Sequence, residues 1–82
     1  MQKHPHLVLL GKRIRKLRTT RGFTQEGFAG ECGLDRSYYG GVERGERNIA
    51  VLNLIKIAAA LGVEVKHLLS GIKFPRKTKA KR

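Results

Sequence analysis

The sequence predicts an all-α fold: a compact five-helix domain with a helix-turn-helix and no strand. Apolar residues recur at steps of three and four along the chain, which is the spacing of one helix face. Glycine follows each of these stretches, in the position where helices commonly end. Thr24 and Asp35, both good N-cap residues, begin two consecutive short segments. A chain of 82 residues has room for one such domain.

The first helix is predicted over 7–21, on an apolar stripe made of Leu7, Leu10, Ile14 and Leu17. The second is predicted over 25–32, with Thr24 as its N-cap. Phe23, just before the cap, is expected to pack on Phe28 as a hydrophobic staple. Both segments end at a glycine.

The third helix is predicted to start after its N-cap, Asp35, and to run to Arg44 before Gly45. A turn around Gly33-Leu34 joins it to the second helix. Two short helices joined in this way form a helix-turn-helix unit.

The fourth helix is predicted over 51–61 and a short fifth helix over 65–70. One face of the fourth helix, sufficient for a core, holds Val51, Leu54, Ala58 and Leu61.

A second apolar strip of the fourth helix lies beside this face and holds Leu52, Ile55 and Ala59. So wide an apolar arc is more than a surface helix needs, and it favours an interface between two copies of the chain. The residues predicted for this homodimer interface are Leu52, Ile55, Leu69 and Ile72. The alternative is that Leu52 and Ile55 lie under the first helix or the tail.

Three parts are therefore predicted: a flexible N-terminus (1–6), the helical domain (7–71) and a basic tail (72–82) expected to be disordered. Eighteen lysines and arginines stand against six acids, a net charge of +12. Such a field attracts phosphate polymers whatever their base sequence. It would also attract an anionic membrane surface or an acidic protein, so charge alone names a class of partners.

Composition argues against several classes of protein. The single cysteine, Cys32, allows no internal disulfide, and no apolar run is long enough to span a bilayer, so we expect a cytoplasmic protein without membrane contact. Three histidines and this cysteine lack zinc-site spacing, and there is no glycine-rich phosphate loop. The acids are too scattered to predict a catalytic pair. We therefore expect no enzyme, metal, cofactor or small-molecule ligand.

The stretch 23–45 resembles the phage-repressor type of helix-turn-helix, the XRE-like family, whose domain has five helices. The residues that carry the resemblance are Thr24-Gln25, Ala29, Gly33, Val42-Glu43-Arg44-Gly45, Ile57-Ala58 and Leu61-Gly62. A narrower likeness lies in Leu34–Tyr38 followed by Gly41–Ile49. It resembles the controller proteins of restriction–modification systems, which regulate their own promoter and the endonuclease gene. The resemblance implies a transcription regulator, such as a repressor, that binds double-stranded DNA.

Chemistry assigns the base-reading residues independently. A recognition helix presents its first turns to base edges in the major groove. At that end Arg36 could bind guanine through its planar fork, and Ser37 and Tyr38 could reach a base or a phosphate. The alternatives are a solvated Arg36 near Asp35 and a Tyr38 packed on the domain surface.

Other residues are predicted to hold the DNA backbone: Thr24, Gln25, Gly40, Arg44, Arg47 and Asn48. For Gln25 the resemblance implies a phosphate at the start of the second helix, where free N–H groups favour anions. For the last three the alternative is ordinary surface polarity. The resemblance also implies a partly buried, structural ion pair between Arg18 and Glu43.

Two glycines, Gly40 and Gly41, are unusual inside a helix. We interpret them as allowing close approach of the backbone to DNA, the alternative being a helix that ends early. A dimer would place two recognition helices on a pseudo-palindromic operator. Two other functions remain open: a basic module that binds RNA or an anionic surface, and an antitoxin-type regulator with a protein partner.

Overall fold

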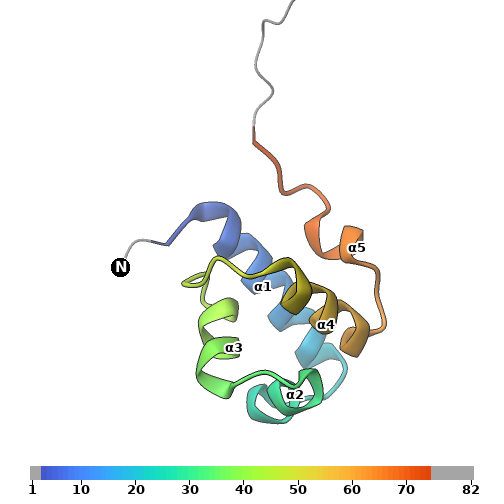
Figure 1. Cartoon of the computed structure of the whole chain (residues 1–82). Helices are drawn as coiled ribbons and strands as arrows, with labels where there is room; N and C mark the ends of the chain where they lie inside the picture. The colour runs from blue at the N-terminus through green and yellow to red at the C-terminus, as the bar shows by residue number, and fades with distance from the viewer. Residues whose placement is uncertain (1–2, 75–82) are drawn as a thin grey trace, which may run out of the picture.

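Five helices follow one another in residues 3–74, the part of the chain that this computed structural model describes (Figure 1). They are α1 (Pro5–Thr20), α2 (Gln25–Cys32), α3 (Arg36–Glu43), α4 (Val51–Leu61) and α5 (Val65–Leu69). Residues 3–74 contain no strand. The predicted all-α fold of five helices is confirmed. Most of the predicted basic tail, from residue 75 onward, lies outside the described residues.

Some helix ends differ from the prediction. Helix α1 begins at Pro5, two residues before the predicted start at Leu7. Proline suits this position because the first N–H groups of a helix have no partner within it, and His4 caps the end by accepting from the His6 N–H. The predicted flexible N-terminus therefore includes the first residues of a helix. Helices α1, α3 and α5 each end one residue earlier than predicted.

Short-range side-chain contacts define the starts of both helices of the helix-turn-helix. Thr24 Oγ1 accepts from the Gly27 N–H at 3.0 Å, and Asp35 caps α3 by the same arrangement. The rings of Phe23 and Phe28 lie 5.1 Å apart, so the predicted staple is confirmed. Between the two helices Gly33 has φ of +71°, a left-handed conformation that glycine adopts without strain.

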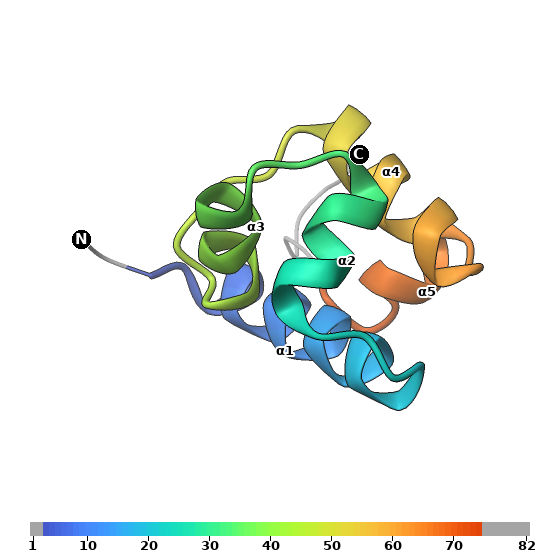
Figure 2. The same cartoon turned by 90° about the horizontal axis from the view of Figure 1, so that it is seen from below.

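All five helices contribute to one core. Figure 2 shows α1 beneath the other helices, with α3 on one side, α4 and α5 on the other and α2 between them. The largest fully buried side chains are Ile14, Phe28, Tyr39, Ile57, Leu61 and Leu68. One core prediction is wrong: Val51 is 69% exposed, and Ile57 lies in the core instead. The buried face of α4 is thus rotated from the face that the apolar spacing predicted.

Helices α1 and α3 approach closely at Gly11. A Cβ placed on Gly11 would lie 2.3 Å from the Glu43 carbonyl oxygen and 2.5 Å from that of Val42. Only a residue without a side chain therefore allows α3 to pack at this distance from α1. This contact fixes the position of α3, the predicted recognition helix, on the domain.

Within residues 3–74, no helix combines the length and the apolar character needed to cross a lipid bilayer.

Candidate nucleic-acid interface

The start of α2 and one face of α3 enclose an open hollow of about 390 Å³. Its lining residues are Gln25, Asp35, Arg36, Ser37, Gly40 and Arg44. The hollow thus brings together five of the residues predicted to contact DNA, and it opens to solvent beside the N-terminus of α2. Free N–H groups at that end of a helix attract anions such as phosphate.

Arg36 is accessible to a ligand. It is the first residue of α3, and its side chain is 70% exposed. The nearest acid is Glu26, at 3.8 Å and equally exposed, rather than the neighbouring Asp35. Because an ion pair between two exposed side chains contributes little, this contact would not hold Arg36 away from DNA. Ser37 is also exposed.

Tyr38 has a mixed position. The residue is half-buried, and its hydroxyl accepts a hydrogen bond from Asn53 Nδ2 of α4 at 3.2 Å. The guanidinium carbon of Arg47 lies 5.7 Å from the centre of its ring. The ring therefore packs on the domain, as the alternative interpretation held, while a contact to DNA stays a prediction.

Gly40 and Gly41 are buried beneath arginine side chains. A Cβ on Gly40 would lie 3.0 Å from Arg44 Nη1, and a Cβ on Gly41 would lie 2.9 Å from Arg47 Cγ. Helix α3 continues to Glu43, so the alternative of an early helix end is wrong. In this structure the two glycines give room to arginines. Of the two, only Gly40 lines the hollow.

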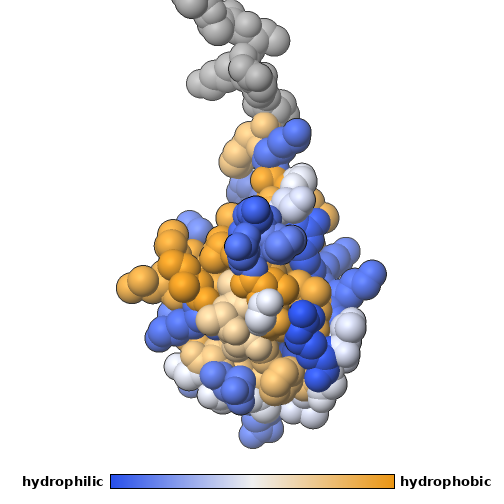
Figure 3. Space-filling model, turned by 90° about the vertical axis from the view of Figure 1, so that its right-hand side faces the viewer, coloured by the Kyte–Doolittle hydropathy of each residue, from blue (hydrophilic) through white to orange (hydrophobic). Residues whose placement is uncertain are grey.

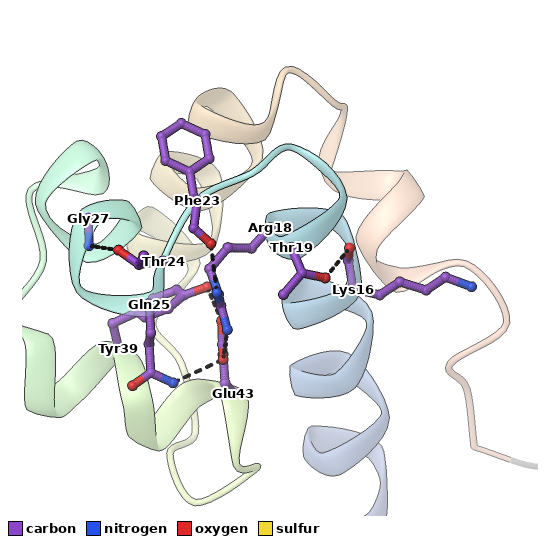
Figure 4. Close-up of polar contacts among 9 residues, drawn as sticks. All are labelled: Lys16, Arg18, Thr19, Phe23, Thr24, Gln25, Gly27, Tyr39 and Glu43. Atoms are coloured by element: carbon purple, nitrogen blue, oxygen red, sulfur yellow. Dashed lines mark hydrogen bonds and ion pairs between the residues drawn. The ribbon is translucent and has the colours of Figure 1, made fainter.

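A buried ion pair lies next to Gln25, one of the residues that line the hollow (Figure 4). Arg18 Nε donates to Glu43 Oε2 at 2.6 Å, and Arg18 Nη2 donates to Glu43 Oε1 at 3.1 Å. Arg18 Nη1 also donates to the Phe23 carbonyl at 2.8 Å. Both partners are only 7% exposed. The pair joins α1 to the end of α3, the arrangement that the family resemblance implied.

Two further side chains donate to the same carboxylate. Gln25 Nε2 donates to Glu43 Oε1 at 3.0 Å, and the Tyr39 hydroxyl donates to Glu43 Oε2. Burial acts to raise the pKa of Glu43, but the hydrogen bonds from Arg18, Tyr39 and Gln25 together outweigh it and lower that pKa. Gln25 therefore connects the hollow to the ion pair. Its contact with a phosphate stays a prediction.

The segment after α3 carries the remaining predicted backbone residues. Arg44 Nε donates to Glu46 Oε1 at 3.1 Å, and Lys3 Nζ lies 3.9 Å from the same carboxylate. Arg47 and Asn48 are exposed, as is the capping residue Thr24. Asn48 lies apart from the hollow, in a second depression that it shares with the N-terminal end of α1.

Apolar side chains gather on a different part of the surface, near α4 and α5 (Figure 3). Leu52 is 73% exposed, and Ile55 and Leu69 are exposed as well. Helix α1 does not cover the strip, so the alternative that Leu52 and Ile55 lie under the first helix is wrong, whereas most of the tail named in that alternative lies outside the described residues. Ile72, by contrast, is half-buried and packs against the core, which leaves less of it for an interface.

Sequence reasoning assigned no role to Asn53. It is half-buried on α4, fifteen residues from Tyr38 in the chain. No local pattern could have paired these two residues, because the contact depends on how α4 packs beside α3.

Comparison with known proteins gives consistent matches. The helix-turn-helix family model matches residues 14–68. The control protein C.MunI of Mycoplasma sp. is 41% identical over 66 residues, which are 79% of this chain and 89% of that protein. The crystal structure of the restriction–modification controller protein C.AhdI from Aeromonas hydrophila matches with a TM-score of 0.77 and 51% identity, over 79% of this chain and 98% of that one. SinR, a master regulator for biofilm formation crystallised with DNA, matches with a TM-score of 0.71 and 32% identity, over 74% of this chain and 98% of that one.

Proposed function

The chain belongs to the helix-turn-helix family, and we propose that it controls restriction–modification genes as a homodimer bound to a pseudo-palindromic operator. It is a sequence-specific DNA-binding transcription regulator. C.MunI and C.AhdI are named as control proteins, and C.AhdI as one of a restriction–modification system, which supports the assignment to restriction–modification genes. The genes under control would include its own, and the protein would act in the cytoplasm, where such DNA lies. The chain would bind DNA without catalysing a reaction.

The observation that carries the proposal is the open hollow beside the first turn of α3. Arg36 and Ser37 project there without strong partners, and the N-terminus of α2 lies next to them. In the proposed complex α3 enters the major groove, Arg36 binds guanine through O6 and N7, and a phosphate lies at the start of α2 against Thr24 and Gln25. Arg44 and Arg47 would hold the flanking backbone.

The apolar strip supports the homodimer. Leu52 and Ile55 of α4 and Leu69 of α5 are exposed although they are large and apolar, and a second copy would bury them. A symmetric dimer presents two copies of α3. Their half-sites would be about one helical turn of DNA apart, which gives the operator its pseudo-palindromic form.

The test is a binding-site selection on random duplexes, followed by a search for the selected site upstream of the protein's own gene and a neighbouring endonuclease gene. The operator is then measured against scrambled duplex, bulk RNA and anionic vesicles at one physiological salt concentration. Preference for the operator is the expected result. Equal competition by RNA or vesicles would instead indicate a general basic module.

Arg36→Ala tests the residue that reads a base. A bidentate contact to guanine discriminates by about 1–3 kcal/mol, so the variant should lose roughly 2–6 kcal/mol on a two-half-site operator. Binding to scrambled duplex should fall far less. Arg36→Lys should restore only part of the loss, because an ammonium lacks the planar fork. Equal losses on both duplexes would mean that Arg36 only holds phosphate.

A further inference from the structure

The side chain of Arg47 does not extend freely from the surface. It lies back along α3, with its guanidinium carbon 5.7 Å from the centre of the Tyr38 ring. A cation above an aromatic face is attracted by the ring's electrons. The aliphatic part of the same side chain passes over Gly41, since a Cβ there would be 2.9 Å from Arg47 Cγ and 3.2 Å from Nε.

The Tyr38 ring is itself held in place by a contact with α4. Its hydroxyl accepts a hydrogen bond from Asn53 Nδ2 at 3.2 Å, and Asn53 belongs to α4. Both residues are half-buried. Two helices therefore fix the ring on which Arg47 rests: α3 supplies the ring, and α4 orients it.

Glycine at position 41 is required by this arrangement. Gly41 is interior to α3, has no unusual backbone angle and would be better replaced by alanine if helix propensity decided. Its missing side chain provides the space for the Arg47 stem. The Tyr38 ring, the Gly41 backbone and the Asn53 amide thus form one seat for one arginine.

We propose that this seat positions Arg47 for DNA, which makes Asn53 a positioning residue that acts on operator recognition through Tyr38 and Arg47. An arginine held in place before binding loses less rotamer freedom when it meets DNA. The inference rests on the proposed function only in taking operator DNA as the ligand of Arg47. The seat itself is a property of the free protein.

A double-mutant cycle on operator DNA tests the proposal. Asn53→Ala removes one hydrogen bond and should weaken operator binding roughly two- to tenfold. In an Arg47→Ala background the same change should have almost no effect, because no arginine remains to be positioned. Lys56→Ala, an exposed change on the same helix, is the matched control and should leave the affinity unchanged in both backgrounds. An equal loss from Asn53→Ala with and without Arg47 would overturn the proposal.

Gly41→Ala provides the second variant. The added methyl group displaces the Arg47 stem, so operator affinity should fall by a similar factor. Combined with Arg47→Ala, it should cost no further affinity and should raise the melting temperature, since alanine favours the helix. If Gly41→Ala leaves operator affinity unchanged, Arg47 does not need the seat.

A measurement on the free protein separates this proposal from the proposed function. Relaxation of the Arg47 Nε–H group by NMR should show a restrained side chain in the wild type and a freely moving one in Asn53→Ala and Gly41→Ala. This result is expected even if no operator is found. An Arg47 side chain that is equally free in all three proteins would overturn the seat without affecting the assignment of Arg36.

Discussion

At the scale of single residues, Glu43 accepts hydrogen bonds from three elements. Arg18 comes from α1, Gln25 from α2, and Tyr39 from Glu43's own helix. A buried carboxylate is costly unless it is paired and hydrogen-bonded, and here all four contacts satisfy it. The same network lowers the pKa of Glu43 and, mainly through the Glu43 hydrogen bond, raises the pKa of Arg18. The free energy of unfolding should therefore decrease in acid, where Glu43 becomes protonated.

Glu43→Gln should cost about 3–5 kcal/mol at neutral pH, because it leaves Arg18 buried without its counter-charge. The pKa of Glu43 is lower in the folded protein than in the unfolded chain, so the unfolded chain binds the proton more tightly. The ionised Glu43 carboxylate contributes its full stabilisation above the ordinary glutamate pKa of about 4.3. This stabilisation is lost as the pH falls through the pKa that Glu43 has in the folded protein. Urea unfolding of the wild type and of Glu43→Gln from pH 7 to pH 3 should show that the difference between their free energies of unfolding becomes smaller in acid. A difference that stays the same at every pH would contradict the prediction.

At the scale of elements, helix propensity and helix packing make opposite demands on glycine. Gly11 and Gly30 both lie inside helices and both weaken them in isolation. Gly11 lies against the backbone of α3, whereas a Cβ on Gly30 would meet no atom within 4 Å. The same residue type is therefore required at one position and dispensable at the other.

Gly11→Ala should destabilise the domain by about 1–3 kcal/mol or more, because neither carbonyl of α3 can move away without shifting the helix. Gly30→Ala should stabilise it by about 0.5–1 kcal/mol. Thermal unfolding of the two variants and the wild type shows whether Gly11→Ala lowers the stability and Gly30→Ala raises it. A Gly11→Ala variant as stable as the wild type, or more stable, would contradict the close approach of α1 and α3.

A second contact between elements involves Arg13 of α1. Its Nη1 donates to the carbonyl oxygens of Ser70 at 2.5 Å and Leu68 at 3.1 Å, at the C-terminal end of α5. A cation suits that end, where carbonyls lack partners within the helix. Arg13→Gln should cost about 1 kcal/mol and loosen α5. Amide hydrogen exchange should accelerate in residues 65–72 and remain unchanged in α2. Equal acceleration in both helices would point to a general loss of stability.

At the scale of the whole molecule, two surfaces with different chemistry occupy different places. The hollow on α2 and α3 carries polar and basic side chains, whereas the exposed strip on α4 and α5 is apolar. One face can therefore meet DNA while the other meets a second copy. The Tyr38–Asn53 hydrogen bond is a direct contact between the helices that carry the two surfaces.

Leu52→Glu combined with Ile55→Glu should give monomers, because four carboxylates would meet across the proposed dimer interface. Operator affinity should fall by at least tenfold. The double change Thr19→Glu with Thr20→Glu, at an exposed helix end, alters the net charge equally and is the control. Sedimentation checks the assembly and titration with operator DNA checks the binding. Wild-type protein that remains monomeric at high micromolar concentration would contradict the homodimer.

Much of the candidate site could be predicted because its signals are local. The caps at Thr24 and Asp35 bond to N–H groups three residues on, and the staple joins positions five apart. Local signals also placed Arg36 and Ser37 at the start of α3, the predicted recognition helix. Contacts between residues a few positions apart depend on the residue types at those positions. The helices, the turns and the first turn of α3 can therefore be predicted from the sequence.

The tertiary structure decided which partners distant residues meet. Spacing alone misplaced Val51 in the core, because the rotation of α4 depends on α2 and α5. Gly11 meets Glu43, Arg13 meets Leu68 and Asn53 meets Tyr38 across 32, 55 and 15 positions, and no period in the sequence encodes such pairs. Gly40 and Gly41 show best which properties the sequence determines and which depend on the tertiary structure. Their presence is visible in the sequence, but that they give room to Arg44 and Arg47 depends on where the chain after α3 folds back.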